Sequence, residues 1–140
     1  MKKIQSKNIK DTQKVAHDLV ASLDGASLIA LMGNLGAGKT VFVKALAEAL
    51  GVKDNVTSPT FVLMKIYDTK HDIIKKLVHV DCYRLEGKED LVDIGLSEYI
   101  EDPNTLVVVE WADKISNLPE QRIKISIQNL GKDARLIEID

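Results

Sequence analysis

The stretch Gly33-Asn34-Leu35-Gly36-Ala37-Gly38-Lys39-Thr40 decides the fold, because it fits the phosphate-loop pattern G-x-x-x-x-G-K-[ST]. Its glycines let the backbone turn so that several N–H groups face one concavity, which a polyphosphate can fill. In such a loop Lys39 reaches the outer phosphates as a point charge, and the hydroxyl of Thr40 can bind Mg²⁺. The pattern therefore predicts a site for nucleotide phosphates.

The residues on either side of this loop favour the same interpretation. Residues 27–32 form a short apolar run typical of a buried strand, and residues 40–50 are rich in helix formers and stop at Gly51. A strand, a glycine loop and a helix in this order are what the motif needs, and the helix adds its positive dipole end. The alternative, a glycine-rich turn with a surface lysine, explains only the loop.

A second strong signal lies at residues 105–111, with the sequence T-L-V-V-V-E-W. An apolar run followed by a carboxylate predicts a central parallel strand with an acid at its C-terminal end, where open α/β sheets bind ligands. In phosphate-loop proteins this acid helps to hold Mg²⁺. Here it is Glu110, one methylene longer than the usual aspartate, so direct and water-mediated contact both stay open. For Trp111 we expect core packing, or else a contact with adenine or a partner.

The strand predicted at residues 76–83 carries a second acidic candidate. A period of two places His79, Asp81 and Tyr83 on one face, and residues 61–67 form the other strand of a hairpin. Two interpretations of Asp81 remain: it pairs with Arg84 or a lysine, or it converges with its neighbours on the phosphates. His79 on its own reads as a core residue. The hydroxyl-rich stretch 57–60 is either a plain β-turn or a switch loop that touches Mg²⁺ or the γ-phosphate.

The remaining pattern completes an α/β fold. We expect a helix capped by Asp11 or Thr12 that ends at residues 24–25, a short helix over 86–93 and a helical turn over 95–100. A strand over 122–128, a turn over 129–133 and a returning strand over 134–140 predict a C-terminal hairpin. The prediction is one domain over residues 1–140 with a three-layer P-loop NTPase fold, in which helices flank a mixed, mostly parallel sheet.

Composition limits the functions that this chain can have. A net charge of −2 argues against bulk electrostatic attraction to nucleic acid, and the single Cys82 favours a reducing compartment. We find no signal peptide or apolar run of membrane length, so we expect a cytoplasmic monomer. The guanine-reading pattern N-K-x-D is absent, which modestly favours ATP. Because the three arginines form no lid, we expect slow hydrolysis that depends on a partner.

Five segments in this order closely resemble the TsaE (YjeE) family, small bacterial ATPases of tRNA threonylcarbamoyladenosine synthesis. They are the loop 33–40, T-S-P-T-F at 57–61, H-V-D-C-Y-R-L at 79–85, G-L-S-E-Y at 95–99 and E-W at 110–111. The resemblance implies that the protein works with TsaB and TsaD, whose complex transfers threonylcarbamoyl to A37 of ANN-decoding tRNAs. The family member resets that complex by ATP hydrolysis, so its link to tRNA is indirect.

The resemblance also implies roles for individual residues, with ATP and Mg²⁺ as the bound groups. Asp81 positions the attacking water or couples the switch loop 57–60, and it acts with Lys39 and Glu110 in catalysis. Thr12 and the turn from Gly131 to Arg135 lie around the base. The phosphates bind to Leu35, Gly36, Ala37, Gly38, Lys39 and Thr40, and Mg²⁺ binds to Thr40 and Glu110.

One position departs from the family pattern: Val41 stands where the family often has a second threonine, which leaves Thr40 in place. Two other functions remain open at this stage. One is a phosphotransferase acting on a small metabolite, and the other is a nucleotide-sensing adaptor without turnover.

Overall fold

The computed structural model describes residues 2–23, 27–34, 37–56, 64–85, 89–90 and 92–140. Within them, strands β1 to β7 form one mixed sheet in the order β1-β7-β6-β2-β5-β4-β3. The strands are β1 Lys2–Ser6, β2 Ser27–Met32, β3 Met64–Asp68, β4 Lys76–Asp81, β5 Thr105–Glu110, β6 Ile123–Gly131 and β7 Ala134–Ile139. The helices are α1 Ile9–Ser22, α2 Lys39–Ala49, α3 Ser97–Glu101 and the 3₁₀ helix η1 Ala112–Lys114.

The centre of the sheet is parallel and its margins are antiparallel. Strands β6, β2, β5 and β4 run in the same direction, whereas β7 pairs antiparallel with both β6 and β1, and β3 pairs antiparallel with β4. Strand β5 is buried at every position, as predicted from its apolar run. The mixed sheet, the flanking helices and the C-terminal hairpin β6–β7 agree with the expected architecture.

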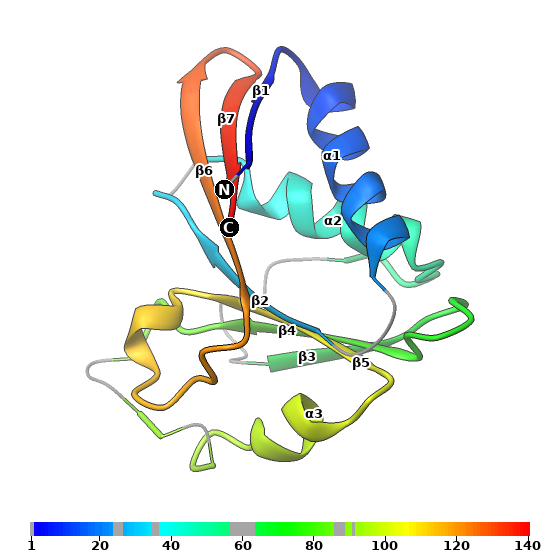
Figure 1. Ribbon diagram of the computed structural model, residues 1–140, viewed down its shortest axis with the longest axis vertical. Coiled ribbons are helices and arrows are strands. Elements are labelled where there is room, and N and C mark those ends of the chain that lie inside the picture. The colour runs from blue at the N-terminus through cyan, green and yellow to red at the C-terminus, as the bar shows by residue number, and fades with distance from the viewer. Residues whose placement is uncertain (1, 24–26, 35–36, 57–63, 86–88, 91) are drawn as a thin grey trace.

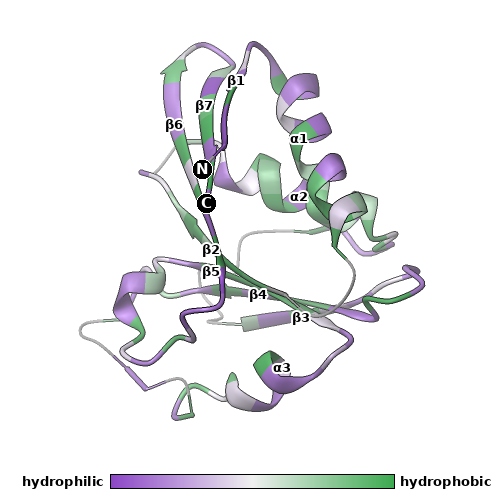
Figure 2. Ribbon diagram, in the orientation of Figure 1, coloured by the Kyte–Doolittle hydropathy of each residue, from purple (hydrophilic) through white to green (hydrophobic). Residues whose placement is uncertain are grey.

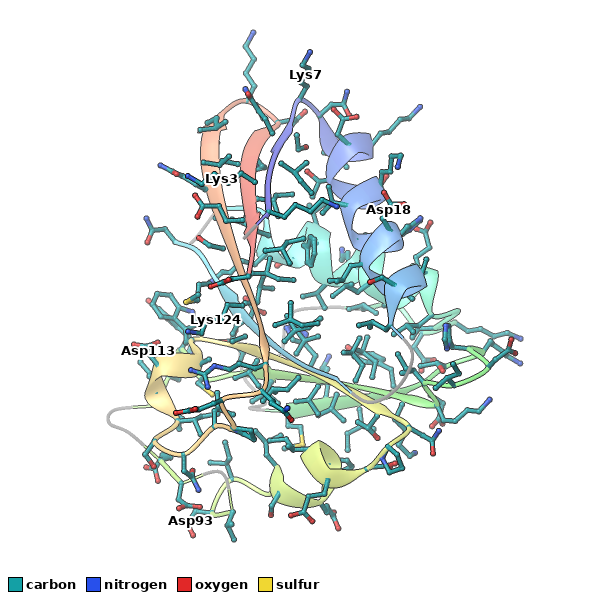
Figure 3. All side chains as sticks on the ribbon, viewed as in Figure 1. Lys3, Lys7, Asp18, Asp93, Asp113 and Lys124 are labelled. Atoms are coloured by element: carbon teal, nitrogen blue, oxygen red, sulfur yellow. The ribbon has the colours of Figure 1, made fainter. Side chains whose placement is uncertain are left out.

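Helices cover the two faces of the sheet over different strands. In Figure 1, α1 and α2 pack together on one face beside β1, β7 and β6, whereas α3 lies on the other side near β4 and β5. Two apolar clusters result, one with Phe42 and Leu46 of α2 and the other with Leu96 beside Val78 and Val107. Figure 2 shows the hydrophobic residues concentrated on the central strands. The charged side chains of Lys7, Asp18 and Asp93 lie on the outside of the molecule (Figure 3).

Three local predictions need correction. Helix α1 begins at Ile9 after Asn8, whose side chain accepts a hydrogen bond from the backbone N–H of Asp11, so neither Asp11 nor Thr12 is the cap. The predicted short helix over 86–93 is wrong where it is described, because Glu89 forms an isolated bridge with Ile115. Strand β6 continues to Gly131, so its turn is shorter than predicted.

One strand was not predicted at all. Strand β1 forms the edge of the sheet beside β7, with Ile4 opposite Ile137. Among the described residues, no helix is long and apolar enough to cross a lipid bilayer.

Candidate functional site

The phosphate loop lies between the end of β2 and the start of α2, at the carboxyl end of the parallel strands. Gly38 precedes α2 with φ at 103°, a left-handed conformation that glycine adopts without steric strain. Gly33 packs so closely against β6 that a Cβ atom there would lie 2.7 Å from the carbonyl oxygen of Ile127. Both positions therefore need glycine for a structural reason. Leu35 and Gly36, predicted to bind phosphate, lie outside the described residues.

Lys39 and Glu110 meet at this end of the sheet. The Nζ atom of Lys39 lies 3.7 Å from Oε1 of Glu110, and 7% and 5% of the two side chains are exposed. Strands β2 and β5 are parallel neighbours with Leu31 opposite Glu110, so the lysine that follows β2 and the acid that ends β5 come together. The two side chains therefore lie close together across neighbouring strand ends, as predicted.

His79 is buried, as expected for a core residue, and it also contacts Glu110, a contact that the sequence did not predict. Its Nε2 atom lies 2.5 Å from Oε2 of Glu110, and both side chains are buried. An ionised carboxylate only accepts hydrogen bonds, so Nε2 donates and the two oxygens of Glu110 have separate partners. The other ring nitrogen, Nδ1, is buried without a partner among the described residues. One feature of the sequence points to this contact: His79 lies on the same face of its strand as Asp81. The contact forms because that strand, β4, lies beside β5, which ends in Glu110.

Asp81 ends β4 directly opposite Glu110 in the parallel register. Its carboxylate accepts a hydrogen bond from the backbone N–H of Tyr83 at 2.9 Å, which holds the chain in a turn just after the strand. The side chain is half-buried and lies at the same edge of the sheet as Glu110. The register thus brings Asp81 to the end of the sheet at which Glu110 lies.

Thr40 and Glu110, the two predicted metal ligands, differ in exposure. Thr40 is exposed in the first turn of α2, whereas 4% of Glu110 is exposed. Hydroxyl and carboxylate oxygens are ligands that Mg²⁺ prefers, and Mg²⁺ usually completes its shell with phosphates and water. The chemistry of this pair therefore fits Mg²⁺.

The residues expected around the base come from three separate elements and also meet. A small cavity is lined by Ile9, Thr12, Gly38, Val41, Asp133 and Arg135. The guanidinium of Arg135 donates to Oδ1 of Asn129 at 3.1 Å and to two backbone carbonyls of the β6–β7 turn. The same Asn129 oxygen accepts the backbone N–H of Gly131 at 2.8 Å, which connects Gly131 to this group.

The side chain of Thr12 is buried in this region. Its Oγ1 atom lies 2.6 Å from Oγ of Ser6, so the start of α1 is tied to the end of β1. Arg135 lies against the phosphate loop, since a Cβ on Gly38 would be 2.9 Å from Nε of Arg135. The structure thus brings Thr12 and Arg135 together beside Gly38, at one end of the phosphate loop.

A second cavity also borders the phosphate loop. It measures about 420 Å³ and is lined by Gly33, Asn34, Ala37, Ser126, Ile127, Gln128 and Asn129. The amide side chains of β6 were not predicted to lie near the phosphate loop, because their alternating pattern indicates only a half-exposed strand.

An aromatic pair extends the site on the Glu110 side. The ring of Trp111 lies 5.3 Å from that of Tyr83, with an angle of 50° between the planes. The Nζ atom of Lys39 lies 4.7 Å from the centre of the Trp111 ring. Trp111 is half-buried and packs against the apolar cluster that contains Leu96, so the expected core packing is confirmed, and its ring also borders the site.

Comparison with known proteins places the chain in a family. The family model described as "Threonylcarbamoyl adenosine biosynthesis protein TsaE" matches residues 6–137. A protein named tRNA threonylcarbamoyladenosine biosynthesis protein TsaE from Treponema pallidum is 37% identical over 135 residues, covering 96% of each chain. The protein of that name from Bacillus subtilis is 39% identical over 93% of this chain and 79% of its own.

A solved structure gives the same result for the fold. The crystal structure of Bacillus subtilis YdiB superimposes with a TM-score of 0.75 at 31% identity, over 97% of this chain and 82% of that one. This likeness confirms the predicted P-loop type of α/β fold. Because the family model and the relatives span nearly its whole length, the chain belongs to the TsaE family, which takes part in threonylcarbamoyladenosine biosynthesis.

Proposed function

We propose that the protein binds ATP with Mg²⁺, hydrolyses it slowly, and supports formation of threonylcarbamoyladenosine at position 37 of tRNA together with TsaB and TsaD. The approach of Lys39 to Glu110 at 3.7 Å, beside the phosphate loop, is the observation that carries the proposal. Membership of the TsaE family supports the pathway.

The two buried charges have complementary roles in this proposal. Lys39 binds the outer phosphates through its ammonium group, together with the N–H groups at the start of α2. Thr40 and Glu110 would hold Mg²⁺, which when bound neutralises charge on the phosphates. The hydrogen bond from His79 fixes one oxygen of Glu110, so the carboxylate keeps a single orientation. Asp81, at the neighbouring strand end, positions the attacking water or couples the site to residues 57–60.

The base would lie on the side of Thr12, Gly131 and Arg135. Thr12 and Arg135 line the small cavity beside Gly38, and Gly131 donates to the same Asn129 oxygen as Arg135. Leu35, Gly36, Ala37, Gly38, Lys39 and Thr40 would then carry the phosphates. Adenine is favoured over guanine because the sequence has no N-K-x-D motif.

The expected hydrolysis is slow until a partner binds. A charge supplied in trans adds roughly 10³–10⁵ in rate in related nucleotide switches, and this chain has only three arginines. The TsaB–TsaD complex is the partner proposed here, and tRNA is contacted only through it. The protein would act as a monomer in the cytoplasm until it joins that complex.

The proposal is tested by measuring ATP binding and turnover for the protein alone and with the TsaB–TsaD complex. We expect slow turnover alone, stimulation by the complex, and support of threonylcarbamoyl transfer over several cycles. Lys39→Ala should weaken ATP binding by about 1.5–3 kcal/mol before Mg²⁺ effects, because a charge-assisted contact is lost. Lys44→Ala, on an exposed position of the same helix, is the matched control. Full activity of Lys39→Ala would contradict the proposal, as would fast hydrolysis without a partner.

The same assays separate the two alternative functions. A labelled γ-phosphate that appears on a metabolite would favour a phosphotransferase. An adaptor without turnover should keep its function in Glu110→Gln and Asp81→Asn variants that bind ATP but do not hydrolyse it. Loss of function in those variants favours the ATPase.

A further inference from the structure

The distance between the charged groups of Lys39 and Glu110 is longer than expected for a buried ion pair. A hydrogen-bonded pair of ammonium and carboxylate has an N···O distance of about 2.7–2.9 Å. Here the distance is 3.7 Å, although both side chains are almost fully buried. Other contacts must therefore hold each group short of direct contact.

The contact on the carboxylate side comes from His79. Its Nε2 atom holds Oε2 of Glu110 at 2.5 Å, so the oxygen nearer to Lys39, Oε1, has its position set from the other side. The carboxylate is thereby fixed without help from the ammonium group.

Among the described residues, Trp111 supplies the contact on the ammonium side. The Nζ atom of Lys39 lies 4.7 Å from the centre of the indole ring, within the distance of about 6 Å at which a cation is attracted to an aromatic face. Burial of Lys39 strengthens this attraction, because little water competes for the ammonium. The indole is neutral, so it holds the ammonium without neutralising its charge.

The backbone of Trp111 is unusual in a way that serves this contact. Its φ is 58°, a conformation rare for a bulky residue, at the turn between β5 and η1. Such strain persists where the surrounding structure holds it and is common at functional sites. Trp111 thus follows Glu110 directly in the chain, yet its ring lies against Lys39.

The Trp111 ring has two further neighbours, Tyr83 and Lys114. Tyr83 contacts it at 5.3 Å, and Nζ of Lys114 lies 5.9 Å from its centre. Lys114 donates to the carbonyl oxygens of Tyr83 and Leu85 at 2.7 and 2.8 Å, so its charge is engaged elsewhere. Of the two cations, Lys39 is closer to the centre of the Trp111 ring, at 4.7 Å against 5.9 Å for Lys114.

We infer that Trp111 is a positioning residue: its indole holds the ammonium of Lys39 away from Glu110, so that the lysine is available to phosphates and the carboxylate to a metal. This inference rests on the proposed ATP site. Without the indole attraction, Lys39 closes onto Glu110, and this direct ion pair must be broken before a nucleotide binds.

The first test uses the fact that Trp111 is the only tryptophan. Growth on mono-, di-, tri- and tetrafluorinated tryptophan changes this residue alone, and each fluorine weakens the electron density of the ring face with little change of shape. Binding of ATP is measured by calorimetry in EDTA, so that Mg²⁺ does not contribute. We expect Kd to rise stepwise with fluorination, by about tenfold over the series. A constant Kd or a falling Kd overturns the inference.

A second readout does not depend on nucleotide. In the nucleotide-free protein, the ring current of Trp111 should shift the ε-methylene resonance of Lys39 upfield in NMR spectra of ¹³C-lysine-labelled protein. Trp111→Leu should abolish this shift, and the N···O distance in its crystal structure should shorten to that of a hydrogen-bonded ion pair. An unchanged resonance, or a distance that stays open, contradicts the inference.

Lys114→Met is the matched control, because Lys114 is the other cation near the ring. The stepwise rise in Kd should persist in this variant, whereas its disappearance would assign the effect to Lys114 and overturn the role of Lys39. If the unsubstituted protein fails to bind ATP even with Mg²⁺ present, the proposed function is wrong, and the NMR readout still decides the Lys39–Trp111 contact.

Discussion

At the scale of single residues, Glu110 connects the parts of the site. One carboxylate oxygen lies 3.7 Å from Lys39 and the other 2.5 Å from His79, and the next residue supplies the ring beneath the ammonium. Three elements, β4, β5 and α2, are therefore joined through one buried acid. Loss of a partner around this acid leaves a buried charge less well compensated, which is costly.

Replacing His79 tests this dependence. His79→Ala removes the hydrogen bond to Oε2 and leaves a buried oxygen of Glu110 unsatisfied, so the free energy of unfolding should fall by about 1–3 kcal/mol or more. His79→Gln, which keeps a donor, should lose less. Urea denaturation of both variants measures the difference. Equal stability of His79→Ala and the unsubstituted protein would show that the contact adds nothing.

Cys82 leads to a prediction about pH. Burial raises the pKa of its thiol to about 12, and the nearby Asp81 carboxylate adds to the shift. Between the ordinary pKa of 9.0 and about 12, the unfolded chain loses this proton and the folded chain keeps it, so stability should fall as pH rises through this range.

The contribution of Cys82 to the fall of stability with pH is measured by urea denaturation of the unsubstituted protein and of Cys82→Ala at several pH values. The variant should lack this part of the alkaline loss of stability, because it has no thiol. At pH 8 the native thiol should also resist alkylation and react after unfolding, as expected for a buried cysteine. Parallel stability curves for the two proteins would contradict the prediction.

Sequence patterns located part of this site and not the rest. Lys39 belongs to a motif whose spacing defines the loop, and Glu110 follows an apolar run that marks a central strand, so both were predictable. The contact between His79 and Glu110 depends on β4 lying next to β5, and a pattern within one strand does not specify its neighbour. The approach of Trp111 to Lys39 depends on a left-handed residue, which the sequence does not signal at a tryptophan.

At the scale of elements, two predictions about helices were wrong because backbone groups found hydrogen-bond partners that the local sequence did not indicate. Asp11 looked like a cap, but its carboxylate accepts the N–H of Lys7 and its own N–H donates to Asn8, which makes it part of a capping arrangement begun by Asn8. Residue Glu89 lies in a stretch of helix formers, yet its backbone N–H donates to the carbonyl of Lys114 at 2.8 Å. Pairing with a distant segment overrode the local helix propensity there.

The start of α2 yields a prediction with an internal control. Gly38 and Gly95 both have positive φ, at 103° and 79°, but only Gly38 has a close neighbour, Arg135. Alanine at either position should cost about 1–2 kcal/mol in stability through backbone strain. Gly38→Ala should also weaken ATP binding, because its Cβ displaces Arg135 from the phosphate loop. Stability is measured by urea denaturation and binding by calorimetry; equal ATP affinities would count against a role for this contact.

At the scale of the whole molecule, the sheet divides into a protected centre and less protected margins. Strand β5 is buried along its length between β2 and β4, whereas β3 is an edge strand with Ile66 exposed. The central parallel strands were predicted from their apolar runs. Strand β1 was not, because its lysines face solvent and what fixes it is a partner from the other end of the sequence.

Hydrogen exchange should follow this division. We expect the amides of β5 to exchange slowest, near the rate set by global unfolding, because opening them requires loss of both apolar clusters. Amides of β3 should exchange faster through local opening at the edge. Residue-resolved NMR measures both, and equal protection of β3 and β5 would contradict the division.

Pairing of β1 with β7 has a consequence for biosynthesis. Figure 1 shows the first strand of the chain beside the last, with the two ends of the chain close together. On the ribosome, β1 is made before its hydrogen-bonding partner β7, and strands β2 to β6 are made between them. Until β7 is present, the hydrogen bond between Ser6 and Thr12 lacks the strand that pairs with Ser6. A stalled chain that lacks β7 therefore exposes the unpaired strand β1 to chaperones and proteases.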